Sequence, residues 1–219
     1  ISVLKRVPVL FSYKTGYFDD LYQMMPKEGY TKVFEDILNH ENITIKLNTD
    51  AKNIISITEN NEIQFEGKVT SVPVIYTGAI DELFENRFGK LPYRSLKFDW
   101  ITYKQESYQD APVVAYPEAK DYTRITEYKK LPVQNIKDIT TIAIEYPLQY
   151  ENNINLEPYY PIPTINNQNI YHLYKKVADE IPNLILCGRL AEYKYYNMDQ
   201  VIESTLNLCE KLKVKMTSK

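Results

Sequence analysis

The 219-residue chain carries a formal net charge of -3, with 44% hydrophobic and 25% charged residues, an ordinary globular composition. It has no global basic field that would favour nucleic acid or an anionic membrane as a partner. No apolar run approaches the roughly 20 residues of a membrane-spanning helix, and no signal peptide is visible, so we expect a cytoplasmic protein. An anionic ligand would have to be bound by a few locally placed arginines.

The cysteines and histidines argue against disulfide and metal chemistry. Cys187 and Cys209, the only cysteines, lie in apolar-periodic stretches, so we expect reduced core thiols. His40 and His172 have no ligand-type partner at metal spacing, so neither a zinc site nor a histidine-based nucleophile is expected. The 20 tyrosines would suit sugar or nucleobase surfaces, but we attribute most of them to an adenine- and thymine-rich genome.

The first third of the chain predicts an α/β arrangement. The continuous apolar run VPVIYT stops at Gly78, a pattern typical of a buried strand in a layered sheet. In chain order, the predicted elements are an extended stretch over 6–13, a helix over 30–40, a strand over 43–47, a hairpin of 54–58 and 62–66 around a turn at 59–61, a buried strand over 72–77 and a short helix over 81–88.

The middle of the chain changes character. Residues 93–150 alternate apolar and polar side chains, with Leu96, Phe98 and Trp100 on one face, which predicts an antiparallel sheet. The end returns to α/β character, with a helical stripe, a buried strand over 183–187 and a last helix from Asn197. The stripe comprises Ile170, Leu173, Tyr174, Val177 and Ile181; the last helix is expected to face Met198, Val201, Ile202, Leu206 and Cys209 inward. This pattern indicates a discontinuous α/β domain with a second domain inserted into it.

Arginines are few, and their forked guanidinium group matches diphosphate oxygens bidentately. The whole set is Arg6, Arg87, Arg94, Arg124 and Arg189. The strand-like surroundings of Arg124 fit either a cross-strand pair with a glutamate or a ligand contact. Arg94 and Arg189 follow turn or strand-end positions, where binding residues collect, whereas Arg87 is expected to be a solvated surface charge.

Two further features leave alternatives open. The clustered tyrosines before Pro161 and before the last helix could bind phosphate through their hydroxyls, or could pack a rim. The helix start at Asn197 could bind an anion or polar group, although many purely structural helices start in this way. The six glycines form no Gly-x-Gly-x-x-Gly cluster of the kind that cradles a dinucleotide pyrophosphate.

Five motifs stand in order between Lys5 and about Leu212. They are KRVPVLF with YFDDLYQMMPKEGY, then VIYTGAIDELFENRFGKLPYRSLKF, DYTRITEYK, EPYYPIP and LCGRLAEYKYYNMDQVI. Together they resemble the UDP-galactopyranose mutases. The resemblance implies an FAD-dependent isomerase of cell-wall polysaccharide biosynthesis that interconverts the six- and five-membered ring forms of UDP-galactose. In such an enzyme, N5 of reduced flavin attacks the anomeric carbon and displaces UDP, and the sugar–flavin adduct recloses in the other ring size.

The resemblance also assigns substrate contacts. Arg6 matches a mobile-loop arginine and Arg124 matches a second arginine, both on the substrate diphosphate. Tyr17, Tyr160 and Tyr195 match their tyrosine partners around the phosphates. Such groups would stabilise UDP as it departs with developing negative charge.

Other matched positions lie beside the cofactor. Arg189 matches a flavin-contacting arginine, Asn197 and Met198 match the helix N-terminus beside the flavin, and Arg94 is expected near the cofactor. Asn197 is also expected to contact substrate, although many members have aspartate there. Ala115 stands where many bacterial members have an asparagine near the substrate.

The resemblance implies a fold of two parts. Residues 1–28 and 81–164 would form an antiparallel substrate-binding sheet domain, and residues 29–80 and 165–219 the remainder of a three-layer α/β FAD-binding domain. The family's Gly-rich FAD motif, flavin-facing histidine loop and aromatic uracil pocket would lie upstream of Ile1, which is not a methionine. We therefore expect the carboxy-terminal portion of a mutase, inactive alone and binding FAD weakly or not at all.

A truncated pseudoenzyme that binds UDP-galactose without chemistry is the alternative, and the retained Arg6, Arg124 and Tyr160 are compatible with both. A plain interaction domain would have no reason to keep five motifs in register. The strands over 72–77 and 183–187 need cover on both sides, so we expect an exposed apolar surface and a homodimer.

Overall fold

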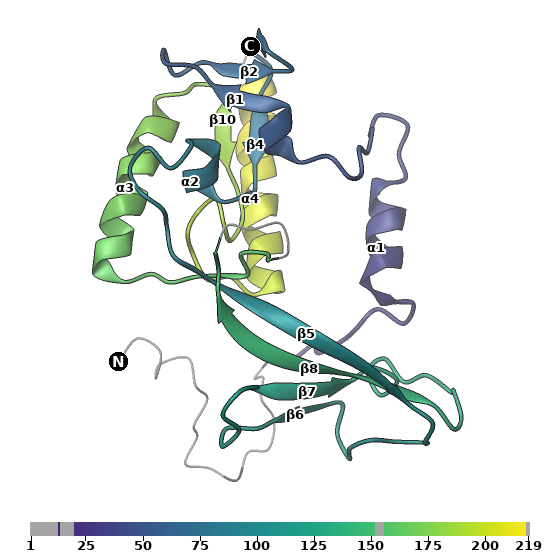
Figure 1. The fold of residues 1–219 in the computed structure, drawn as a ribbon. Helices are drawn as coiled ribbons and strands as arrows, with labels where there is room; N and C mark the ends of the chain where they lie inside the picture. Colours follow the sequence, from purple (N-terminus) through teal and green to yellow (C-terminus); the bar gives the residue numbers. More distant parts are fainter. Residues whose placement is uncertain (1–12, 14–19, 152–155, 218–219) are drawn as a thin grey trace.

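A computed structural model describes residue 13, residues 20–151 and residues 156–217 of the chain. It shows a mixed α/β fold, with four α-helices and three sheets in the described part (Figure 1). The helices are α1 (Gly29–Leu38), α2 (Ile80–Leu83), α3 (Ile165–Asp179) and α4 (Met198–Thr217), and a 3₁₀ turn spans Ala51–Asn53. None of these helices is long and apolar enough to cross a membrane.

The predicted antiparallel sheet is confirmed. Its five strands follow the order β6-β7-β8-β5-β9, and every pairing is antiparallel. The strands are β5 (Tyr93–Tyr103), β6 (Val113–Ala115), β7 (Arg124–Glu127), β8 (Thr140–Gln149) and β9 (Tyr160–Pro161). Because Phe98 lies opposite Glu145 and Glu145 opposite Arg124, these three side chains share one face of the sheet.

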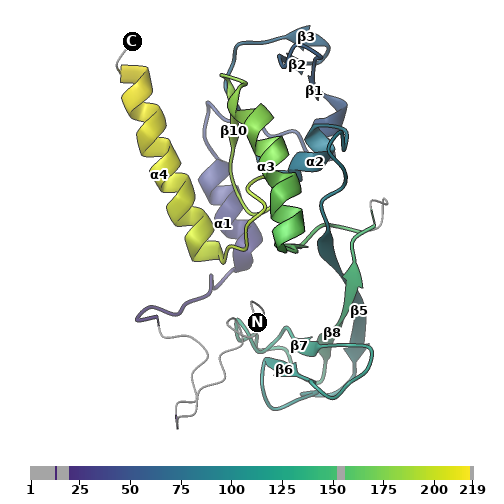
Figure 2. The same ribbon diagram turned by 90° about the vertical axis from the view of Figure 1, so that its left-hand side faces the viewer.

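The α/β part surrounds a short parallel pair, β4 (Val74–Tyr76) and β10 (Leu184–Leu186), which confirms the two predicted buried strands in position. Figures 1 and 2 show α3 and α4 on opposite sides of this pair. The predicted hairpin is also confirmed, as β1 (Ile55–Ile57) pairs antiparallel with β2 (Ile63–Phe65). The strand β3 (Lys68–Val69) extends that sheet.

The core of the α/β part is rich in tyrosine. Tyr93, Tyr174 and Tyr193 are among its largest fully buried side chains. Their hydroxyls are satisfied internally: Tyr93 donates to the buried carboxylate of Asp81 at 3.2 Å, and Tyr174 donates to the Gly89 carbonyl at 2.7 Å. These hydrogen bonds allow a polar-tipped aromatic ring to be buried at little cost.

Several local predictions are wrong. Residues 43–47 form no strand: they are exposed and pair with no described strand. The apolar stripe of α4 points outward: Met198 is 52%, Ile202 57% and Leu206 62% exposed, and Cys209 is also exposed. Of the five residues predicted to face inward, only Val201 is half-buried. Ser204, Thr205 and Leu208 are half-buried on the same side of the helix, and no side chain between residues 198 and 213 is fully buried.

Helix α1 has the predicted amphipathic pattern but buries none of its side chains, and it stands apart from the other helices (Figure 1). In α3, Tyr174 and the following Ile181 are buried as predicted, whereas Leu173 is 49% exposed.

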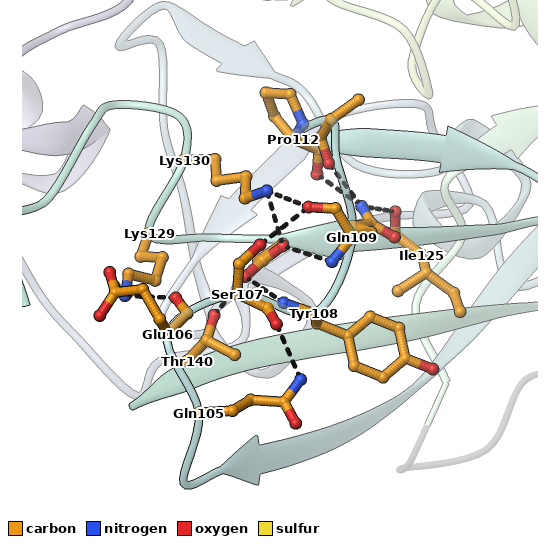
Figure 3. A network of polar contacts seen from close by, with 12 residues as sticks. Gln105, Glu106, Ser107, Tyr108, Gln109, Pro112, Ile125, Lys129, Lys130 and Thr140 are labelled. Carbon is orange, nitrogen blue, oxygen red and sulfur yellow. Dashed lines mark hydrogen bonds and ion pairs between the residues drawn. The ribbon is translucent and has the colours of Figure 1, made fainter. Parts of the chain in front are cut away.

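A buried carboxylate lies where β7 ends and β8 begins. The side chain of Glu127 is 0% exposed and accepts hydrogen bonds from Thr140 Oγ1 at 2.7 Å, the Tyr108 amide at 2.9 Å and the Gln109 amide at 3.0 Å. Lys130 Nζ lies 3.4 Å from the same carboxylate and also donates to the Gln109 carbonyl. Tyr108 and Gln109 lie in the loop after β5, Lys130 lies in the loop after β7, and Thr140 begins β8 (Figure 3), so Glu127 ties both loops to the sheet.

Candidate functional site

Arg189 is fixed in the loop that follows β10. The buried Gly188 turns the chain with φ of 92°, a left-handed conformation that favours glycine. From the next position, the Arg189 guanidinium donates to the Tyr159 carbonyl at 3.1 Å and to the Tyr196 carbonyl. Two backbone carbonyls, from segments far apart in the sequence, thus orient this cation.

Two tyrosine rings accompany Arg189. The rings of Tyr160 and Tyr195 stack with centroids 5.8 Å apart and planes at 16°, and the guanidinium carbon lies 4.9 Å from the first centroid and 5.2 Å from the second. This geometry is a cation–π arrangement with both rings. The structure therefore brings Tyr160, from one motif, together with Arg189 and Tyr195, from another.

Arg124 makes the cross-strand pair that the sequence left as one of two options. Its Nε lies 2.8 Å from Glu145 Oε1, directly across β7 and β8, and Thr123 Oγ1 donates to the same oxygen at 3.2 Å. Partial burial lowers the pKa of Arg124, but the hydrogen bonds and charge of Glu145 and Tyr160 raise it above the ordinary value overall. The cation is therefore permanent, and its side chain remains 43% exposed on the sheet face.

Tyr160 is linked to both arginines. Its phenol raises the pKa of Arg124, and its ring centroid lies 4.9 Å from the guanidinium carbon of Arg189. Arg94 is the β5 residue directly opposite Tyr160, and its exposed side chain shares that face of the sheet. Ala115 lies directly opposite Arg124 on β6, so the position that departs from many bacterial members adjoins this cluster.

Asn197 and Met198 stand at the predicted helix start. The Asn197 amide donates to the Gln200 side chain at 2.9 Å, and its carbonyl accepts from the Val201 amide at 3.0 Å. Gln200 thus provides half of a capping box. Both Asn197 and Met198 have exposed side chains. Their ligand roles stay predictions.

Two of the predicted substrate-binding residues, Arg6 and Tyr17, lie outside the described residues. Arg87 is exposed as predicted, with its guanidinium carbon 4.7 Å from the Phe84 ring centroid. Sequence reasoning missed Glu145, although a lone carboxylate in the apolar alternation of residues 140–146 was a usable signal. It also missed Glu192, whose contacts within its own loop carry no sequence pattern.

Comparisons with known proteins bear on the family of the chain. A family model described as UDP-galactopyranose mutase matches residues 1–195. The UDP-galactopyranose mutases of Mycoplasma pneumoniae and Mycoplasma genitalium are 39% and 38% identical to the chain, each over 96% of it and 53% of the relative. A dTDP-fucopyranose mutase of Escherichia coli is 34% identical over 98% of the chain and 55% of its own length.

The chain spans about half the length of the curated relatives it matches. The family model nevertheless covers most of the 219 residues and includes the segments that carry Arg124, Tyr160 and Arg189. The resemblance found in the five motifs is thereby confirmed, and the chain belongs to the UDP-galactopyranose mutase family.

Proposed function

We propose that this chain supplies the diphosphate-binding face of an isomerase that interconverts UDP-galactopyranose and UDP-galactofuranose. One observation carries the proposal: the Tyr160 phenol raises the pKa of Arg124, and its ring centroid lies 4.9 Å from the guanidinium carbon of Arg189, so two arginines from different elements are coupled to one tyrosine. Arginine pairs with several phosphate oxygens at once, so such a cluster suits a nucleoside diphosphate better than a single carboxylate.

The names of the relatives support the same ligand chemistry. Two of them are named for UDP-galactopyranose and one for dTDP-fucopyranose, so a nucleoside diphosphate joined to a pyranose is common to all three. Their nucleosides and sugars differ. A site built on diphosphate contacts is the feature that these substrates can share.

The geometry indicates how the cluster would act. Glu145 engages Arg124 through Nε, so the terminal nitrogens are the ones that would reach phosphate oxygens. A guanidinium held in advance stabilises negative charge as the diphosphate leaves the anomeric carbon, without a reorganisation cost at that moment. Tyr195, stacked on Tyr160, would place a further hydroxyl beside the phosphates. Arg6 and Tyr17 complete the proposed set of contacts.

The described residues fit one side of a flavin site. Arg189 commits two N–H groups to carbonyls and keeps others, while Asn197 and Met198 are exposed at the start of a 20-residue helix. With Arg94, these residues would contact FAD, and when bound the reduced flavin supplies the nucleophile for the anomeric carbon. The 219 residues contain no Gly-x-Gly-x-x-Gly cradle, so we propose weak FAD binding and negligible mutase activity for this chain alone.

The proposal retains the two-part division, with a substrate-binding sheet domain formed by 1–28 and 81–164 and part of an FAD-binding domain formed by 29–80 and 165–219. It also retains a homodimer, supported by the outward apolar stripe of α4 at Ile202 and Leu206. Sedimentation velocity of the purified chain tests the dimer, and flavin absorbance after removal of free nucleotide tests FAD retention.

Titration with UDP and dTDP tests the diphosphate site directly. Arg124→Lys keeps the charge but loses the fork, so we expect about tenfold weaker binding of both nucleotides. Arg87→Lys is the matched control, because Arg87 is an exposed arginine packed on phenyl rings outside the cluster, and its affinity should equal that of the wild type. Wild-type protein that binds neither nucleotide, or equal loss in both variants, would refute the proposed site.

A further inference from the structure

The loop that joins β10 to α4 carries both Arg189 and Tyr195, yet its shape depends on another residue. We propose that Glu192 is a positioning residue that holds this loop, residues 188–196, in the conformation that presents Arg189 and Tyr195 to Tyr160. The inference rests on the proposed function, because it concerns the same diphosphate and flavin-facing cluster. It assigns Glu192 no contact with substrate.

The two carboxylate oxygens of Glu192 join the two ends of the loop. Oε2 accepts the Gly188 amide at 2.9 Å, and Oε1 accepts the Tyr196 hydroxyl at 3.2 Å. The backbone reinforces this closure, since the Glu192 amide donates to the Gly188 carbonyl at 3.0 Å. One side chain thus fixes the residue before Arg189 and the residue after Tyr195.

The far end of this link leads back to the cation. The carbonyl of Tyr196 accepts a hydrogen bond from the Arg189 guanidinium, so the position of Tyr196 helps to set the position of Arg189. The ammonium of Lys194 adds to the same end, because it lies 3.3 Å from the Tyr196 hydroxyl and 4.6 Å from the ring centroid. Tyr196 OH therefore receives a hydrogen bond from Lys194 and donates its own proton to Glu192.

The middle of the loop is held separately. Tyr193 is buried and donates its hydroxyl to the carbonyls of Pro92 at 2.7 Å and Ile162 at 3.0 Å. Its φ of 46° lies in the left-handed region, which a surrounding framework must maintain. Since Tyr193 anchors the loop to the core without Glu192, removal of Glu192 should free the loop ends and leave the core folded.

Hydrogen exchange provides a direct test of the positioning. In Glu192→Ala, the amides of residues 188–197 should exchange about tenfold faster, because the Gly188 amide loses its acceptor and Tyr196 loses its tether. Glu192→Gln keeps an acceptor for the Gly188 amide, and its NH2 group can donate to the Tyr196 oxygen, which reverses that hydrogen bond but keeps the tether, so it should restore slow exchange. Glu180→Ala, which removes an exposed carboxylate at the end of α3, is the matched control and should leave the loop unchanged.

The UDP titration then separates this inference from the proposed function. We expect about tenfold weaker UDP binding in Glu192→Ala, and an affinity within about threefold of the wild type in Glu192→Gln and Glu180→Ala. The double variant Glu192→Ala, Tyr196→Phe should bind UDP no more weakly than whichever of the two single variants binds it more weakly. Both substitutions remove the same Tyr196–Glu192 hydrogen bond.

The outcomes are distinguishable. Wild-type protein that fails to bind UDP would overturn the proposed function and this inference together. If the wild type binds UDP, and Glu192→Ala has the same UDP affinity and the same amide exchange as the wild type, the positioning role alone is overturned. Failure of Glu192→Gln to restore either property would do the same, because the claim depends on hydrogen bonds that glutamine can make.

Discussion

Replacement of the buried Glu127 by alanine should destabilise the protein by about 3 kcal/mol. The change leaves the Tyr108 and Gln109 amides and the Thr140 hydroxyl without their acceptor. A buried donor without a partner costs about 1–3 kcal/mol, and the neighbouring exposed loop lets water relieve part of that cost. The change also leaves the partly buried ammonium of Lys130 without its carboxylate partner. Removal of one partner of a buried ion pair costs about 3–5 kcal/mol of stability.

Chemical denaturation at pH 7 measures this loss, and a melting midpoint lower by about 6–12 °C should accompany it for a chain of this size. Glu118→Ala, an exposed carboxylate, serves as control and should change stability by less than about 0.5 kcal/mol. A loss below about 1 kcal/mol in Glu127→Ala would show that the network contributes no net stability, and the reasoning would be refuted.

The stability lost in Glu127→Ala should also depend on pH. Burial alone would raise the pKa of Glu127, but hydrogen bonds, led by that from Thr140, lower it below the ordinary value of 4.5. A carboxylate with a lowered pKa stabilises the folded state fully above its ordinary pKa and loses that contribution as pH falls through the lowered value. The stability difference between wild type and Glu127→Ala should therefore be complete at neutral pH and shrink in acid.

Two further predictions concern the α/β core and the thiols. Tyr174→Phe removes a hydroxyl that accepts from the Phe88 amide at 3.0 Å and donates to the Gly89 carbonyl at 2.7 Å, so we expect a loss of about 2 kcal/mol in urea unfolding; an unchanged midpoint would contradict it. Cys209 is exposed and Cys187 buried, so a thiol reagent should modify one thiol in the native protein and the second only after unfolding. Rapid reaction of both would show that the end of β10 opens.

Local periodicity predicted the sheet well, because alternation over 93–103 and 140–149 is a direct consequence of side chains on opposite faces of a strand. The hairpin was also accessible, since Asn61 adopts the left-handed conformation that asparagine tolerates in a turn. These elements depend on neighbours within a few residues along the chain.

The predictions that failed depended on distant partners. Helix α4 carries one apolar stripe through Met198 and Ile202 and another through Val201 and Leu208, and periodicity gives the angle between them, not which stripe meets the chain. The pairing of Arg124 with Glu145, one of the two options that the sequence left open, also depends on which strands become neighbours. The resemblance supplied the identity of the candidate residues, but their convergence on Tyr160 required coordinates.

The antiparallel sheet enters and leaves the α/β part at a single place. Tyr93, the first residue of β5, lies opposite Pro161 in β9, and the Ile162 amide donates to the Pro92 carbonyl at 3.2 Å. The two ends of the segment between them are thus one hydrogen bond apart. Because the Tyr193 hydroxyl bonds to the carbonyls of Pro92 and Ile162, the sheet and the loop that carries Arg189 share one point of attachment, and a shift at that point would move both.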